Sequence, residues 1–253
     1  RSIQASYLLV SRRAVNTPTL RSIEDLADVF AAPYTGSLEN LLGARLGARI
    51  AALAARELGR ALIGTEIYLP QMGTRIIDWL RPIAAAILDI ATEERDLYME
   101  YWNSQAGEGS VILADIGYDG TIQSQLVKLT NRELGGAYFA AKRGMDQVHH
   151  KHGWGRARFF DERSEDTFES PVMEYHLMLE AILTSPAGQF SHFEHGPHGL
   201  HPVHFPNAVN AYQWSVIERI QAGAQQFIDD VCAVTGPDTV DLAFDSAHVQ
   251  EPL

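Results

Sequence analysis

Apolar residues occur along this chain both in short continuous runs and at helical spacing. The first run, Tyr7–Val10, precedes the polar segment Ser11–Arg13, a pattern typical of a buried strand that ends at a loop. We therefore expect a strand at about residues 5–10. The following apolar positions recur at helical spacing between glycines and prolines, which predicts a helical block at about residues 20–105.

A strand, a helix and a second strand are predicted next. The β-branched run Val111–Asp115 indicates a strand, residues 122–129 have helical spacing, and Gly135–Ala141 is typical of another strand. Two strands joined through a helix pair in parallel with a right-handed crossover. We therefore expect an α/β protein with a short parallel sheet, a large helical insertion and C-terminal helices.

The last hundred residues mix polar and helical segments. Residues 142–170 are polar and rich in glycine and charge, so we expect a long mobile loop there. Val172–Leu183 has helical spacing, a histidine-rich stretch extends to Phe205, and Ala208–Val234 predicts a long helix.

Composition excludes several classes of protein. The 253 residues carry a formal net charge of −12, which is the wrong sign for a chain that binds a phosphate backbone, so we expect no nucleic-acid partner. Charged residues interrupt every apolar stretch before 18 residues, and no signal peptide is visible, so we expect no transmembrane segment. One cysteine cannot form an internal disulfide, which favours a cytoplasmic protein. The chain begins at Arg1, which suggests a start downstream of the natural N-terminus.

The turn after the predicted strand 111–115 has the chemistry of a phosphate site. Ligands bind at the C-terminal edge of parallel strands, and a glycine turn before a helix presents backbone N–H groups to an anion. Gly117 and Gly120 would allow close approach, Thr121 adds a hydroxyl, and Asp115 could hold sugar hydroxyls or a magnesium ion. The alternative is a plain strand-to-helix turn that needs glycine for its dihedral angles.

Two further charged groups could assist a displacement at an anomeric carbon. Asp119 lies inside the glycine turn and is a candidate base for the attacking hydroxyl, although an acid there could also cap the next helix. Ser11, Arg12 and Arg13 follow the first predicted strand, so one arginine could neutralise a diphosphate leaving group. A solvated arginine pair on a loop is the alternative.

Five histidines recur at a spacing of three in the last third of the chain: His192, His195, His198, His201 and His204. Glycines and prolines between them argue against a helix, so we expect a loop. Such a loop could bind a transition metal, could line a phosphate or acceptor-sugar site through His195 and His198, or could be an ordinary surface loop. A second cluster, His149, His150 and His152, lies among lysines and arginines and could close over an anionic substrate.

The segment Asp115-Ile-Gly-Tyr-Asp-Gly-Thr-Ile-Gln123, with the apolar run before it, resembles the strand and loop of phosphoribosyltransferases. It is more similar to phosphoribosyltransferase-like domains of bacterial polysaccharide biosynthesis, which often accompany a haloacid-dehalogenase-type phosphatase. Three further segments resemble that group in the same order: Tyr7–Arg12, Glu180–Gly188 and Ile220–Ile228.

The resemblance implies a single domain over residues 1–253, with an α/β core at about 5–13 and 107–145 and a loop and helical part at about 146–253. The implied reaction transfers 5-phosphoribosyl from phosphoribosyl diphosphate (PRPP) to a sugar hydroxyl of a lipid-linked glycan, with Mg²⁺ at Asp115. A partner phosphatase would then leave a ribofuranose. The implied substrate-binding residues include Glu180 and members of the turn: Gly117, Tyr118, Gly120, Thr121, Ile122 and Gln123.

Two other functions remain open from the sequence. The histidine stretch 192–204 could make the chain a metal-dependent hydrolase. The glycine turn could also belong to a non-catalytic domain that binds a sugar phosphate for a partner enzyme.

Overall fold

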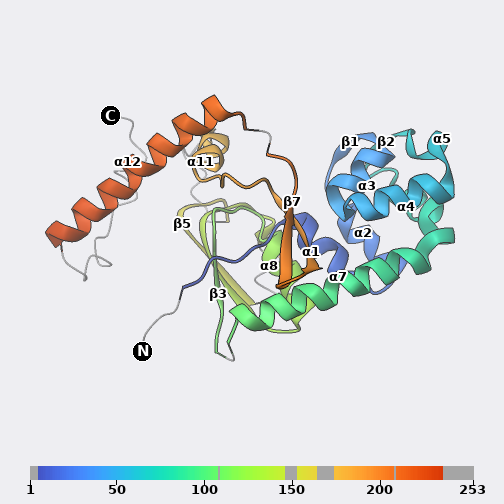
Figure 1. Ribbon diagram of the computed structural model, residues 1–253, viewed down its shortest axis with the longest axis horizontal. Coiled ribbons are helices and arrows are strands. Elements are labelled where there is room, and N and C mark those ends of the chain that lie inside the picture. Colours follow the sequence, from blue (N-terminus) through green and yellow to red (C-terminus); the bar gives the residue numbers. More distant parts are fainter. Residues whose placement is uncertain (1–4, 108, 146–152, 164–173, 208, 236–253) are drawn as a thin grey trace. The chain divides into compact units, whose positions relative to one another are not determined.

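The computed structural model describes residues 5–107, 109–145, 153–163, 174–207 and 209–235 (Figure 1). The chain forms two compact units, each assembled from segments that are distant in sequence. Unit 1 contains residues 1–111, 121–134 and 189–205, and unit 2 contains residues 112–120, 135–188 and 206–253. Among the described residues, no helix is both long and apolar enough to cross a bilayer.

The predicted helical block is confirmed and forms most of unit 1. Its elements are α1 (Arg12–Thr19), η1 (Ile23–Asp25), α2 (Leu26–Val29), β1 (Tyr34–Ser37), α3 (Leu38–Leu46), α4 (Ala48–Leu58), α5 (Arg60–Ile63), β2 (Glu66–Leu69), α6 (Gly73–Leu80), η2 (Arg81–Ile83) and α7 (Ala84–Gln105). Leucines and isoleucines from these helices form one continuous buried core. The block also contains an unpredicted antiparallel pair, β1 with β2, in which only Ile67 and Leu69 of β2 are buried.

The strand predicted at residues 5–10 is wrong. Tyr7 is 78% exposed, and the backbone of Leu9 bonds to two tyrosine hydroxyls of α7 instead of to a neighbouring strand. Ser11 then caps α1, because its Oγ accepts a hydrogen bond from the Ala14 amide at 3.0 Å. The arginine pair that follows therefore lies on a helix and not on a loop.

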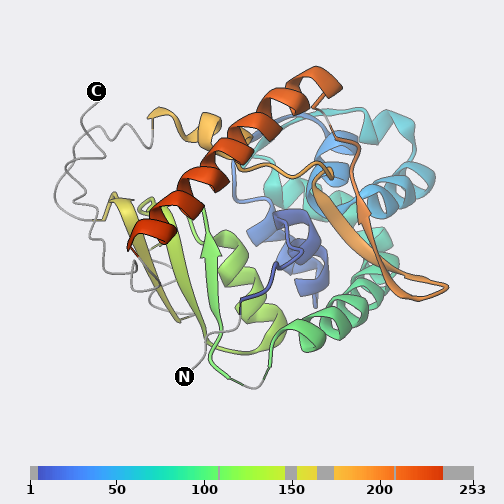
Figure 2. The same ribbon diagram turned by 60° about the vertical axis from the view of Figure 1, so that its left-hand side comes forward.

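The histidine-rich stretch is a β-hairpin, so the predicted loop is also wrong. Strands β6 (Phe190–Gly196) and β7 (Gly199–His204) pair antiparallel around a turn at Gly199, whose φ is 107° (Figure 2). Phe193 is buried and its ring lies 4.6 Å from that of Tyr101 on α7. Aromatic packing on α7 thus holds a segment whose composition alone argues against regular structure.

Unit 2 contains a short sheet in the order β3 (Ile112–Asp115), β4 (Leu134–Ala141) and β5 (Gly153–Asp161). Strands β3 and β4 are parallel, with Asp115 paired to Tyr138, and α8 (Thr121–Thr130) connects them along the chain. The predicted strand, helix and strand are confirmed, as is a mixed α/β class with a short parallel sheet.

In the C-terminal part of the chain the two predicted helices are confirmed, and the predicted loop is wrong. Helices α11 (His176–Ile182) and α12 (Ala211–Thr235) are present in unit 2. Strand β5 occupies part of the segment 142–170 that was predicted to be a loop. The cluster His149, His150 and His152 lies outside the described residues.

Candidate functional site

The glycine turn after β3 is held against the end of β4. The Ala140 amide donates to the Ile116 carbonyl at 3.1 Å, and the Lys142 amide donates to the Tyr118 carbonyl at 2.8 Å. Gly117 has φ 149°, and a Cβ there would lie 2.6 Å from the Ala140 carbonyl oxygen. Glycine is therefore required at this position by both dihedral angle and space. The turn lies at the C-terminal edge of the parallel pair, as predicted.

Side chains from two other segments of unit 2 approach Tyr118. Lys142, just after β4, places its Nζ 5.2 Å from the centre of the Tyr118 ring, and His176 of α11 packs edge-on at 5.7 Å. The Tyr118 hydroxyl is buried and has no hydrogen-bond partner among the described residues. Burial, followed by the negative charges of Glu180 and Asp115, raises the pKa of Tyr118 to about 12. At neutral pH this phenol is therefore a neutral hydrogen-bond donor.

The structure thus brings Glu180 close to the turn, although 60 residues separate it from Gly120 in sequence. The sequence did not single out His176, because one histidine inside the predicted helix 172–183 carries no pattern of its own.

A shallow hollow of about 370 Å³ lies at the strand edge of unit 2, on the sheet that carries the turn. It is lined by Ala114, Asp115, Ile116, Ala137, Tyr138, Phe139 and Arg158. Burial and the nearby Asp115 raise the pKa of Tyr138, so this second phenol is also neutral. Arg158 comes from β5 and supplies a cation to the same hollow as Asp115. The site therefore combines two carboxylates, Asp115 and Glu180, with two phenols and two cations, counting Lys142.

Asp119 lies within the turn and is exposed. Its Oδ1 would be 2.6 Å from a Cβ added at Gly144. The carboxylate consequently lies against the backbone at Gly144, and a side chain at that position would displace it. Gly120, next in sequence, has φ 66°, a left-handed conformation that favours glycine.

The remaining turn residues, Thr121, Ile122 and Gln123, begin α8 and belong to unit 1. Thr121 is exposed, whereas Gln123 is fully buried and its Nε2 donates to the Leu134 carbonyl at 2.7 Å. This bond connects α8 to the start of β4, so the Gln123 amide has a structural role.

Arg13 is an internal residue of unit 1. Its guanidinium donates to both oxygens of Glu94, at 2.7 and 2.9 Å, and also to the carbonyls of Ser191 and Leu46. Both side chains of the ion pair are 1% exposed. Ser11 is buried as well, and its Oγ donates to the Phe190 carbonyl at 2.7 Å. Arg12 is the exposed member of the arginine pair.

The hairpin strands divide four of the five histidines between two faces. Successive residues of a strand point to opposite faces, so a spacing of three places His192 and His195 on different sides. His192 bonds to Glu194 at 3.1 Å, and no group of three potential metal ligands occurs within the described parts of the chain. His198 is exposed at the hairpin turn.

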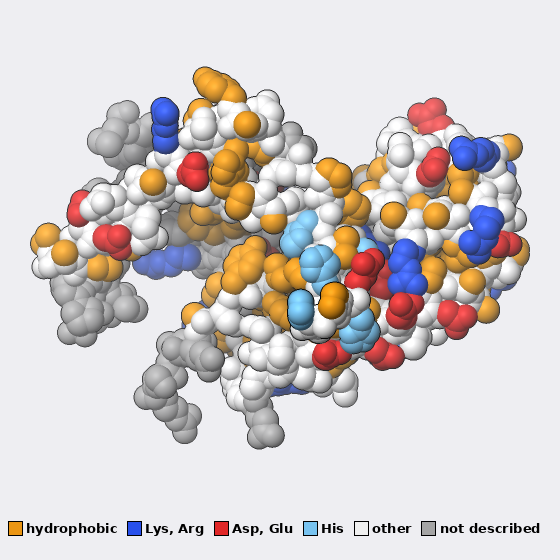
Figure 3. Space-filling view, viewed as in Figure 1, with side chains coloured by type: hydrophobic (Ala, Val, Ile, Leu, Met, Phe, Trp, Pro, Cys, Tyr) orange, Lys and Arg blue, Asp and Glu red, His pale blue; other side chains and the backbone are white. Residues whose placement is uncertain are grey.

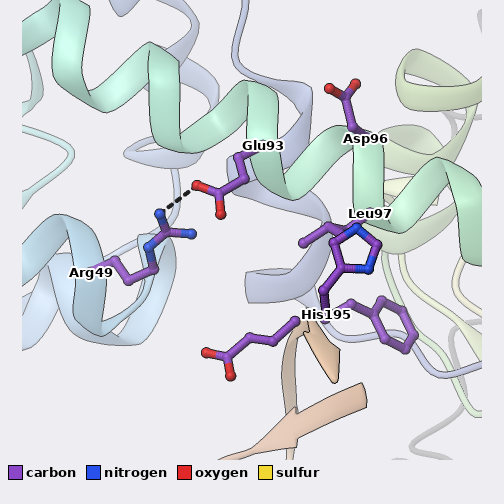
Figure 4. A pocket seen from close by; sticks show the side chains of 7 residues that line it. Arg49, Glu93, Asp96, Leu97 and His195 are labelled. Carbon is purple, nitrogen blue, oxygen red and sulfur yellow. Dashed lines mark hydrogen bonds and ion pairs between the residues drawn. The ribbon is translucent and has the colours of Figure 1, made fainter. Parts of the chain in front are cut away.

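His195 lines a separate pocket of about 550 Å³ in unit 1 (Figure 4). The lining residues are Arg49, Glu93, Asp96, Leu97, Phe193, Glu194 and His195. Arg49 pairs with Glu93 at 2.6 Å, so two carboxylates remain without a lining arginine. This charge balance favours a hydroxyl-bearing or cationic group over a phosphate.

Comparison with known proteins adds no identification. No family model matches the chain, and no curated protein matches it.

Proposed function

We propose that the chain transfers a 5-phosphoribosyl group from PRPP to a sugar hydroxyl of a lipid-linked glycan in bacterial surface-polysaccharide synthesis. The main support is the turn Asp115–Gly120, which hydrogen bonds hold at the C-terminal edge of β3 and β4 beside two cations. Such an edge is where α/β sheets bind phosphorylated ligands. The sequence resemblance of residues 111–123 supplies the choice of PRPP.

Each group near the turn has a role in this proposal. Lys142 and Arg158 neutralise phosphate charge, and the neutral Tyr118 hydroxyl donates a hydrogen bond to a phosphate oxygen. Asp115 binds ribose hydroxyls. In the reaction the acceptor oxygen attacks the anomeric carbon, the bond from that carbon to diphosphate breaks, and the acceptor proton passes to the Asp119 carboxylate.

Magnesium fits this site only together with the substrate. Mg²⁺ is commonly held by one or two carboxylates with substrate phosphates and water completing its shell. Asp115 is the carboxylate in the hollow, and the described residues provide no three-ligand group that would hold a metal alone. When bound, the ion would neutralise charge on the diphosphate leaving group.

Calorimetric titration with PRPP and Mg²⁺ tests the proposal, with ribose 5-phosphate and a nucleotide-sugar as comparison ligands. We expect micromolar PRPP binding that Asp115→Asn weakens at least about tenfold, which corresponds to about 1.4 kcal/mol. The matched control is Asp89→Asn, an exposed acid on α7. Unchanged binding by the Asp115 variant would overturn the site assignment, and binding without turnover of a glycan acceptor would favour a non-catalytic sugar-phosphate domain.

A further inference from the structure

Strands β4 and β5, with the residues just after them, carry an excess of positive charge on an otherwise acidic chain. Residues 135–145 and 153–163 contain five basic and two acidic side chains, whereas the whole chain has a net charge of −12. A group of basic side chains is visible in unit 2, below α12 as drawn in the space-filling view (Figure 3). A local cationic region on an acidic protein favours an anionic ligand.

Both acidic side chains of this region already have a basic partner. Asp161 accepts a hydrogen bond from Arg163 Nε at 2.7 Å, and Glu162 accepts one from the Arg143 amide at 3.1 Å. Three cations of the region remain, and they form no ion pair with any residue that the structure describes: Lys142, Arg156 and Arg158. A phosphorylated ligand would supply the missing negative charge, because guanidinium and ammonium groups form strong charge-assisted hydrogen bonds with phosphate oxygens.

Arg156 and Arg158 lie on the outward face of β5. Successive residues of a strand point to opposite faces, and Ala157 between them packs against the buried cluster that contains Tyr138. Both arginines are exposed, so they share the solvent face of the strand. Their Cα atoms are about 6.6 Å apart along an ideal strand, which allows both guanidinium groups to reach one diphosphate.

Trp154 restrains Arg156 on this face. The centre of its ring lies 5.8 Å from the guanidinium carbon of Arg156. A Cβ added at Gly135 would lie 2.5 Å from the same ring, so Trp154 is packed against β4 at that glycine. A cation–π contact with a packed ring limits the freedom of the arginine and lowers the entropy cost of binding an anion.

We infer that Arg156 and Arg158 bind the diphosphate of PRPP, while Lys142 and the glycine turn bind its 5-phosphate; this assignment rests on the proposed function. Arg158 shares the hollow with Asp115, which leads into the turn. Lys142 lies over the Tyr118 ring within that turn. From the lysine through Asp115 to the two arginines, the groups follow the order of 5-phosphate, ribose and diphosphate in PRPP. Three cations thus meet three phosphate groups.

The two arginines act on the leaving group. When the bond from the anomeric carbon to diphosphate breaks, its electron pair remains on a diphosphate oxygen. Guanidinium groups that donate to the phosphate oxygens stabilise that charge. Lys142, at the other end of the substrate, contributes to binding of the 5-phosphate alone.

Calorimetric titration of the 253-residue chain with three ligands tests the assignment, each in the presence of Mg²⁺: PRPP, ribose 5-phosphate and inorganic diphosphate. We expect Arg156→Ala to weaken binding of PRPP and of diphosphate about tenfold, and to change that of ribose 5-phosphate by less than about twofold. Lys142→Ala should give the reverse pattern, with weaker PRPP and ribose 5-phosphate binding and unchanged diphosphate binding. The matched control is Arg75→Ala on α6 of unit 1, which removes another arginine from a tryptophan ring, that of Trp79 at 4.9 Å, and should affect none of the ligands.

Arg156 is exposed, so thermal unfolding should show the same midpoint for Arg156→Ala and the wild type. An equal loss of PRPP and ribose 5-phosphate binding in that variant, or unchanged diphosphate binding, would overturn the diphosphate site. A wild-type chain that binds diphosphate through Arg156 but does not bind PRPP would retain the diphosphate site and overturn the proposed function. A wild-type chain that binds none of the three ligands would overturn both.

Discussion

Single residues in this molecule have roles that depend on burial more than on residue type. Glu93 and Glu94 are neighbours on α7, yet Glu93 forms an exposed ion pair with Arg49 and Glu94 forms a buried one with Arg13. The sequence indicated that an arginine after Ser11 could act on a substrate. It contained no sign that the carboxylate 81 residues away would hold Arg13 inside the protein.

These two glutamates provide a matched test of buried charge. We expect Glu94→Gln to reduce the free energy of unfolding by about 3–5 kcal/mol, because it leaves the buried Arg13 charge without its counter-charge. Glu93→Gln should change it by about 1 kcal/mol or less, since its pair with Arg49 is solvated. Urea unfolding measures both. Equal losses in the two variants would show that the Arg13 pair contributes no more than a surface pair.

Tyr118 should make the stability depend on pH in the alkaline range. Its pKa rises from 10.0 to about 12 in the folded chain, so the fold favours the neutral phenol. The contribution is therefore complete below pH 10 and is lost as the pH rises towards 12. We expect the difference in unfolding free energy between wild type and Tyr118→Phe to shift in favour of the variant over this range. A difference that stays constant with pH would contradict the raised pKa.

At the scale of elements, local pattern predicted those pieces whose periodicity is strong. Strands β3 and β4 have continuous apolar runs, and α8 and α12 have clear helical spacing. Strand β5 and the hairpin β6–β7 were missed, because polar residues, glycine and proline mask their pattern and their stability comes from neighbours. Phe193 of β6 is the clearest case, with Tyr98, Tyr101 and Phe190 around its ring.

Removal of the Phe193 side chain should destabilise the hairpin. Phe193→Ala deletes a side chain that is 4% exposed, so we expect a loss of about 3–5 kcal/mol in unfolding free energy. His201→Ala, on an exposed position of β7, should cost about 0.5 kcal/mol or less. Hydrogen exchange of residues 190–204 should accelerate in the first variant alone. Wild-type exchange in Phe193→Ala would show that other contacts hold the hairpin.

The turn after β3 should be destabilised by the single methyl group that an alanine adds at Gly117. Gly117→Ala combines an unfavourable φ with a contact of 2.6 Å to the Ala140 carbonyl. We therefore expect the free energy of unfolding to fall by more than about 1 kcal/mol. We also expect the variant to lose PRPP binding. Gly43→Ala in α3, where nothing lies within 4 Å of the added atom, should be neutral or stabilising. Thermal unfolding and calorimetry measure the two effects separately.

At the scale of the whole molecule, the residues of the candidate site converge within unit 2. Asp115 and Tyr118 come from one segment, Lys142 and Arg158 from around β4 and β5, and Glu180 from α11. The arginine and histidine candidates Arg13 and His195 belong to unit 1 instead. A ligand bound at the turn should therefore slow hydrogen exchange in unit 2 before it does so in unit 1.

Hydrogen exchange with and without PRPP and Mg²⁺ can locate that change. We expect slower exchange in residues 112–120 and 174–183 when PRPP is bound, because the turn and α11 contact one another through Tyr118. The pair β1 and β2 in unit 1 serves as the internal control and should exchange at the same rate in both conditions. Protection confined to unit 1 would contradict the assignment of the site to unit 2.

The sequence by itself determined the parallel strand, helix and strand, the long C-terminal helix and the glycine turn, because each depends on spacing within a few residues. Tertiary structure alone decided the partner of Arg13, the pairing of the histidine strands and the approach of Glu180 and His176 to Tyr118. The contacts of Arg13 and Tyr118 join residues tens of positions apart, and the hairpin depends on α7 for its packing. Burial and packing against distant elements, which no local pattern records, fix them.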